Sequence, residues 1–142
     1  EAIMPLLQTF GKNIVYQGAA GAGQHAKMCN QIVVASSMIG VCESMAYAKH
    51  AGLSPETVLQ SITAGAAGSW ALSNLAPRML AADDAPGFYI KHFVKDMGIA
   101  LKECTHMNLQ LPGLQLANKM YNELVEQGYG DSGTQALYYY YK

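Results

Sequence analysis

Apolar residues between positions 28 and 45 recur every three or four residues, and this spacing constrains the fold more than any other feature of the chain. A period of about 3.6 residues is typical of a helix with one buried face. The pattern predicts one long helix from about Gln24 to His50, which ends at Gly52 because glycine closes helices readily. The predicted buried face consists of Met28, Ile32, Val33, Ala35, Ile39, Cys42 and Met45.

Shorter helices are predicted around this long one. Ser54 precedes a proline, a pattern that begins a helix, and this helix is expected to reach Ile62. Ser69 is expected to cap a helix that begins at Trp70 and that Pro77 bends or interrupts. Further helices are predicted over residues 2–10, about 90–107 and 111–126, and in the tail from residue 134.

Residues 13–17, with the sequence Asn-Ile-Val-Tyr-Gln, are the one segment with convincing strand character. One strand cannot form a sheet by itself, so this strand is interpreted as the remnant of another domain. We therefore predict an all-α fold built around the long helix. Its helical domain is expected to cover residues 18–142, and residues 1–17 are expected to be the tail of a preceding domain.

The composition restricts the partners of the chain. Apolar residues make up 51% of it and charged residues 13%, so we expect extensive burial in an oligomer or against another domain. The net charge is −1 and there is no basic stripe, which argues against nucleic acid. No apolar run reaches the roughly 18 residues that span a bilayer, which argues against a membrane. Cys29, Cys42 and Cys104 fall in apolar helical patterns, where free thiols behave as small hydrophobes, and a reducing cytoplasm suits them.

The start of the long helix carries the residues most suited to chemistry. Asn30 and Gln31 follow Lys27 at i+3 and i+4, so one helical face presents a cation and two amides. Gly21 and Gly23 before them allow a ligand to approach the backbone. This combination favours a small anionic substrate, with Lys27 as a general acid or base. The alternative is a solvated surface lysine, which is what an isolated lysine most often is.

Three other features have competing interpretations. Ser69 and Trp70 form either an ordinary cap with a packing aromatic or a helix start whose backbone amides hold a carboxylate. Lys95 belongs to a charged helix face, which is normally solvated, but it lies beside the loop that contains Phe88. The glycines of residues 18–23 have the wrong spacing for a dinucleotide-binding turn and are interpreted as a crossover between domains. The histidines and cysteines have no metal-ligand spacing, so a metal is not expected.

Three motifs together resemble the C-terminal domain of the β-hydroxyacid dehydrogenases, which include 3-hydroxyisobutyrate dehydrogenase and tartronate semialdehyde reductase. These motifs are Gly21-x-Gly23-x-x-x-Lys27-x-x-Asn30-Gln31, Gly68-Ser69 before a helix, and Lys95-Asp96-Met97. The resemblance covers nearly the whole chain and implies a helical domain similar to that of 6-phosphogluconate dehydrogenase. It also implies a preceding Rossmann domain, to which residues 1–17 belong and which binds most of an NAD or NADP cofactor, and a homodimer or tetramer.

The resemblance implies a role for each singled-out residue. Lys27 would be the catalytic acid/base in the interconversion of a small 3-hydroxy acid with its semialdehyde or keto acid. The substrate-binding residues would be Gly23, Asn30, Gln31, Ser69 and Trp70, and the cofactor-binding residues would be Phe88 and Lys95. The alternative function is a non-catalytic helical module for oligomerisation or interaction. The helical half alone is expected to be inactive.

Overall fold

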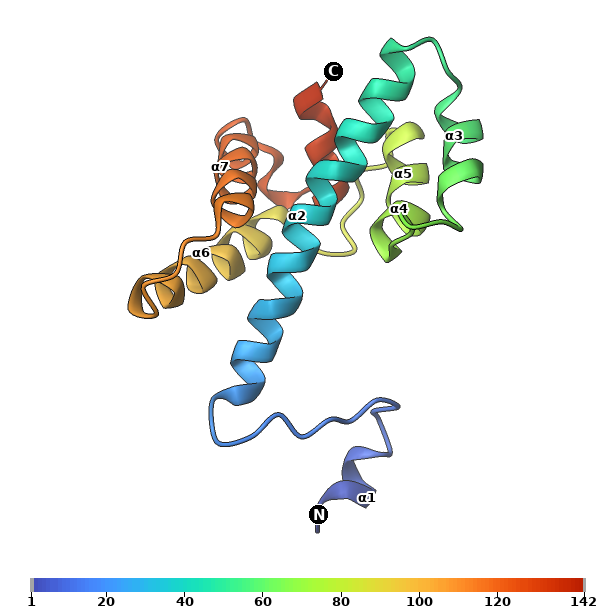
Figure 1. Cartoon of the computed structure of the whole chain (residues 1–142). Coiled ribbons are helices and arrows are strands. Elements are labelled where there is room, and N and C mark those ends of the chain that lie inside the picture. Colours follow the sequence, from blue (N-terminus) through green and yellow to red (C-terminus); the bar gives the residue numbers. More distant parts are fainter. Residues whose placement is uncertain (1, 142) are drawn as a thin grey trace.

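A computed structural model describes residues 2–141 of the chain, and within this range all regular elements are helices (Figure 1). In chain order they are α1 (Met4–Leu7), α2 (Ala22–His50), α3 (Pro55–Ile62), α4 (Trp70–Asn74), α5 (Ala76–Leu80), α6 (Ile90–His106), α7 (Pro112–Glu126) and the 3-10 helices η1 (Tyr129–Asp131) and η2 (Thr134–Tyr141). The all-α prediction is confirmed.

The long helix α2 is the axis of the molecule. Figure 1 shows α6 and α7 on one side of it and the short helices α3, α4 and α5 on the other. The tail helix η2 packs against α2 as well, so the C-terminal part of the chain returns to the long helix. By length and composition α2 is long and apolar enough to cross a membrane, and 44% of its most apolar stretch is buried inside the protein.

The helix ends follow the predicted capping chemistry. The Ser54 hydroxyl accepts a hydrogen bond from the backbone N–H of Thr57 at 3.2 Å, and Ser69 accepts one from Leu72 at 3.0 Å. Gly52 has a φ of 74°, in the left-handed region that glycine tolerates, directly after the end of α2. The predicted interruption is present: α4 ends at Asn74 and α5 begins at Ala76, with Pro77 in the first turn of α5.

The core lies where α2, α6, α7 and η2 meet. The Phe93 and Tyr121 rings pack edge to face with their centroids 5.1 Å apart, and both residues are fully buried. The Tyr121 hydroxyl donates to the backbone carbonyl of Thr134 at 2.8 Å, so its one polar atom is satisfied inside the core. Burial also raises the pKa of the Tyr121 hydroxyl and of the Cys42 thiol, which keeps both groups neutral.

The packing accounts for the tail of four tyrosines. Tyr138 is buried in the core, and the Tyr139 ring packs against Tyr129 with the centroids 5.3 Å apart. The Tyr141 hydroxyl donates to the Glu43 carboxylate of α2 at 3.4 Å. Residues 138, 139 and 141 therefore hold the C-terminal tail against the helical body through burial, ring packing and a hydrogen bond.

The structure departs from two predictions about the N-terminal part. Residues 13–17 form no strand, because a strand needs a neighbouring strand for its backbone hydrogen bonds and residues 2–141 contain none. Figure 1 shows this segment lying beyond the end of α2. The helix predicted over residues 2–10 is only one turn long, Met4–Leu7. The domain boundary between residues 17 and 18 stays a prediction.

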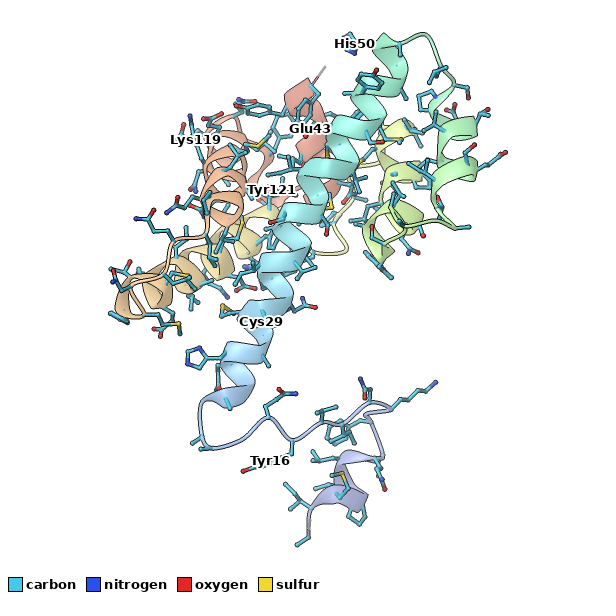
Figure 2. The ribbon with its side chains drawn as sticks, viewed as in Figure 1. Tyr16, Cys29, Glu43, His50, Lys119 and Tyr121 are labelled. Atoms are coloured by element: carbon cyan, nitrogen blue, oxygen red, sulfur yellow. The ribbon has the colours of Figure 1, made fainter. Side chains whose placement is uncertain are left out.

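The predicted buried face of α2 holds only in part. Ala35, Ile39, Cys42 and Met45 of the predicted face are buried. Val33, in contrast, is 65% exposed, and Cys29 is also exposed. Figure 2 shows Cys29 on the part of α2 that projects from the helical body, whereas Tyr121 lies inside that body. The periodicity predicted a continuous stripe, but Met28, Ile32 and Val34 are only half-buried, packed at the edge of the core.

Candidate functional site

The polar residues at the start of α2 converge on one atom. Lys27 Nζ donates to Gln31 Oε1 at 2.9 Å, and Asn30 Nδ2 donates to the same oxygen at 2.8 Å. The helix brings the three together because residues three and four apart share a face. The predicted convergence of a cation and two amides is therefore present in the structure, while their roles stay predictions.

A second helix holds this cluster in place. The Gln31 side chain is 3% exposed, and its Nε2 donates to Asp96 Oδ2 of α6 at 2.8 Å. The other carboxylate oxygen of Asp96 lies 3.1 Å from Lys95 Nζ. These contacts join Lys27, Gln31, Asp96 and Lys95 in one network across two helices that are far apart in the sequence.

The cluster lines a cleft of about 320 Å³. Its walls come from α2, from α4 and the residues that flank it, from the loop before α6 and from the start of η2. The lining residues are Lys27, Asn30, Gln31, Val33, Val34, Ser37, Ser69, Trp70, Ala71, Leu75, Phe88 and Thr134. A few polar groups among mostly apolar walls are typical of a small-molecule site.

Two aromatic side chains border the cleft. Trp70 is 71% exposed, which is unusual for an indole that could pack in a core. The Phe88 ring rests edge to face on the buried Phe93, with the centroids 5.8 Å apart. Its loop is fixed further because the Phe88 carbonyl accepts from the Thr134 backbone N–H at 3.2 Å. Phe88 is thus held in position while its ring stays partly open to solvent.

The structure does not bring all the predicted site residues to the cleft. Asn30, Gln31, Ser69, Trp70 and Phe88 line it together with Lys27. Gly23 instead lines a separate hollow of about 910 Å³ formed largely by residues 3–18. The Lys95 side chain is 64% exposed and reaches the cluster only through Asp96.

The glycines before Lys27 shape the backbone of the turn into α2. Gly21 precedes the first residue of α2 with a φ of 95°, and Gly18 has a φ of 127°. Residues with a side chain rarely adopt a positive φ, so both positions favour glycine. Gly23 has no such requirement, and a Cβ added to it would meet nothing within 4 Å.

The sequence analysis missed several residues of the site. Asp96 was noted only as the neighbour of Lys95, yet it is the partner of Gln31 from 65 positions away. Ser37 and Thr134 also line the cleft, and neither carries a local signal. Ser37 lies seven positions after Asn30 on the same helix, which is close to two full turns, so extending the face of Asn30 along α2 could have found it. Within residues 2–141, no three His, Cys, Asp or Glu side chains are grouped as metal ligands would be.

Comparisons with known proteins agree on one group of enzymes. A family model described as "NAD-binding of NADP-dependent 3-hydroxyisobutyrate dehydrogenase" matches residues 21–141. An uncharacterized oxidoreductase of Bacillus subtilis, YkwC, is 62% identical over 97% of this chain and 48% of its own length. A probable mitochondrial 3-hydroxyisobutyrate dehydrogenase-like protein of Arabidopsis thaliana is 49% identical over 94% of this chain and 40% of its own length.

A solved structure gives the same result for the fold. It is described as 3-hydroxyisobutyrate dehydrogenase of Mycobacterium tuberculosis with L-serine. It matches with a TM-score of 0.89 and 27% identity over 98% of this chain and 50% of that chain. The present chain spans about half the length of the relatives it matches.

Proposed function

The chain belongs to the family of the NAD-binding domain of NADP-dependent 3-hydroxyisobutyrate dehydrogenases, and from this premise we propose that its cleft is the substrate side of a dehydrogenase active site. The reaction would interconvert a small 3-hydroxy acid with its semialdehyde or keto acid. The observation that carries the proposal is the Lys27 ammonium, held 2.9 Å from Gln31 at the wall of a mostly apolar cleft.

Lys27 would be the general acid/base. Its Nζ has three protons when charged and two when neutral, and only one is needed for the bond to Gln31. The nitrogen can therefore take the proton of a substrate hydroxyl, or return it to a developing alkoxide, without giving up that bond. Asn30 would hydrogen-bond the substrate next to it. Ser69 and Trp70 would form the opposite wall.

The residues present suit an NAD(P) cofactor. The Phe88 ring provides an apolar surface at the cleft, and the exposed Lys95 ammonium, paired with Asp96, provides a cation for an anionic ligand. When bound, the cofactor supplies the site that accepts or donates hydride. These two residues would add to a Rossmann domain that, we propose, precedes this one and binds most of the cofactor. The assembled enzyme would be a homodimer or tetramer.

The test is a Lys27→Met substitution in the full-length protein. We expect kcat to fall by about 100- to 10,000-fold, the range of a lost general acid/base, while the affinity for the cofactor is retained. Lys102→Met is the matched control, because Lys102 is exposed on α6 and does not line the cleft. Steady-state kinetics with a panel of 3-hydroxy acids and cofactor titration by fluorescence provide the two measurements.

Turnover of Lys27→Met equal to that of Lys102→Met would reject Lys27 as the proton-transfer group. It would also favour the alternative of a non-catalytic interaction module. Equal losses in both variants would show that the fall in kcat is not specific to this lysine.

A further inference from the structure

We infer that Gln31 and Asp96 are positioning residues, which set the direction of the hydrogen bonds that Lys27 and Asn30 offer to the cleft. This inference rests on the proposed function, because it assigns the two residues an effect on the proton-transfer step. Asp96 does not line the cleft, and Gln31 is almost fully buried beside it. Their effect would therefore pass through Lys27 and Asn30.

The Asp96 carboxylate fixes the orientation of the Gln31 amide. A glutamine amide has one acceptor end and one donor end, and either can face a given neighbour. Asp96 as a carboxylate can only accept, so it requires Gln31 Nε2 to point toward α6, where the two atoms are 2.8 Å apart. The Oε1 end must then face Lys27 and Asn30.

Two residues, Lys27 and Asn30, face the Oε1 oxygen of Gln31 and are oriented by it. Gln31 Oε1 can only accept, so Asn30 must turn its Nδ2 toward it, at 2.8 Å. The Oδ1 atom of Asn30 is thereby directed away from Gln31 and is available as an acceptor for a ligand in the cleft. Lys27 likewise spends one N–H on Gln31, at 2.9 Å, which fixes Nζ while leaving its remaining positions for a substrate.

Burial makes the hydrogen bond between Gln31 and Asp96 rigid. Gln31 is 3% exposed, and the Asp96 side chain is 14% exposed and also paired with Lys95. A buried hydrogen-bonded chain of this kind is costly to break, because each freed polar atom would lose its partner without gaining water. A lysine on an exposed helix face would otherwise move among many rotamers, and catalysis requires a fixed position.

The test is Gln31→Met in the full-length protein, because methionine has a similar length and no polar ends. We expect kcat to fall by about 10- to 100-fold with KM little changed, since a misplaced catalytic group lowers the rate more than the binding. Gln60→Met is the matched control, on the exposed face of α3 away from the cleft. A raised KM with unchanged kcat would overturn the inference and assign Gln31 to substrate binding.

A double substitution tests whether the effect passes through Lys27. If Gln31 acts by positioning that lysine, Gln31→Met should cost much less when Lys27 is already Met. Undiminished loss in that background would overturn the inference. If the activity of Lys27→Met is too low to measure, the kcat and KM of the single variant decide.

A pair of substitutions tests the role of Asp96. Asp96→Asn keeps one acceptor oxygen that can face Gln31 Nε2, whereas Asp96→Ala keeps none, so Asn should preserve kcat better than Ala does. Equal losses would contradict a role through the Gln31 hydrogen bond. Thermal melting of both variants shows whether either loss comes from unfolding.

A chemical readout separates this inference from the proposed function. Competitive acetylation with acetic anhydride, followed by mass spectrometry, gives the reactivity of Lys27 relative to Lys102. We expect this ratio to rise in Gln31→Met, because Lys27 loses its acceptor, and in Asp96→Ala, because that acceptor loses its fixed orientation. An unchanged ratio would overturn the inference. Normal turnover of Lys27→Met, in contrast, would overturn the proposed function even if the ratio rises.

Discussion

The two halves of α2 lie in very different surroundings although they form one continuous helix. From Ala35 to Ala48 the helix buries apolar residues such as Met38 and Met45. From Ala22 to Val34, a stretch that the structure describes completely, only one residue is buried, and that residue is the polar Gln31. In Figure 1 this half projects from the helical body toward the N-terminal segment.

This difference shows where stability and function reside. The packed half holds the domain together through apolar burial, which is the dominant favourable term in folding. The projecting half contributes little to that core but carries Lys27, Asn30 and Gln31. A half-helix that is mostly exposed in an apolar chain is suited to being covered by another domain or subunit. The chain also spans only about half the length of the relatives it matches.

Hydrogen exchange should reveal the largest difference between the two halves. In the 142-residue chain, amides of residues 22–34 are expected to exchange at least about 100-fold faster than those of residues 35–48, because apart from Gln31 the side chains of this half are at most half-buried and oppose local opening less. Mass spectrometry of overlapping peptides would measure this. Equal protection would contradict the comparison, whereas slower exchange of residues 22–34 in the full-length protein would sharpen it.

A pair of identical substitutions should give the next largest effect. Val41 is 6% exposed in the packed half and Val33 is 65% exposed in the projecting half. Val41→Ala should lower the free energy of unfolding by about 1–3 kcal/mol through lost burial and a small cavity. Val33→Ala should change it by less than about 0.5 kcal/mol. The change in helix propensity is the same at both positions, so it cancels in the difference between the two variants.

Urea denaturation of both variants gives the two values. Similar destabilisation by the two substitutions would mean that the projecting half is packed more firmly than the structure shows.

Acid should have the smallest effect, and it should act outside α2, on the loop that follows α5. Hydrogen bonds from the Arg78 side chain, 2.8 Å away, and from the Ala85 backbone lower the pKa of Asp83, whose loop also binds Gln135. A lowered pKa in the folded state means that the carboxylate stabilises the fold above its ordinary pKa, and that this contribution is lost as the pH falls through the folded value.

Asp83→Asn should therefore be less stable than the natural chain at pH 7, and the difference should shrink below about pH 4. The effect is small because the Asp83 side chain is 45% exposed. Thermal melting of both proteins between pH 7 and pH 3 measures it. A difference that does not change with pH would show that the charge of Asp83 contributes nothing to stability.

Most of the fold could be predicted because the relevant signals are local. The capping serines Ser54 and Ser69, the closing glycine Gly52 and the interruption at Pro77 act within a few residues, and the structure confirms each. The grouping of Lys27 with Asn30 and Gln31 is equally local, since it depends only on the helical repeat. Residues 13–17 failed as a strand for the opposite reason, because strand formation depends on a partner elsewhere.

The sequence by itself determined the helices, their ends and the three polar residues on one face of α2. Only the tertiary structure decided which part of that helix is buried. It also brought Asp96 of α6 into hydrogen-bond contact with Gln31, and it placed Trp70 and Phe88 at the cleft. The physical reason is the range of the forces involved. Helix periodicity and capping are short-range properties of the backbone, whereas burial and the partner of a buried amide depend on which distant segments pack against it.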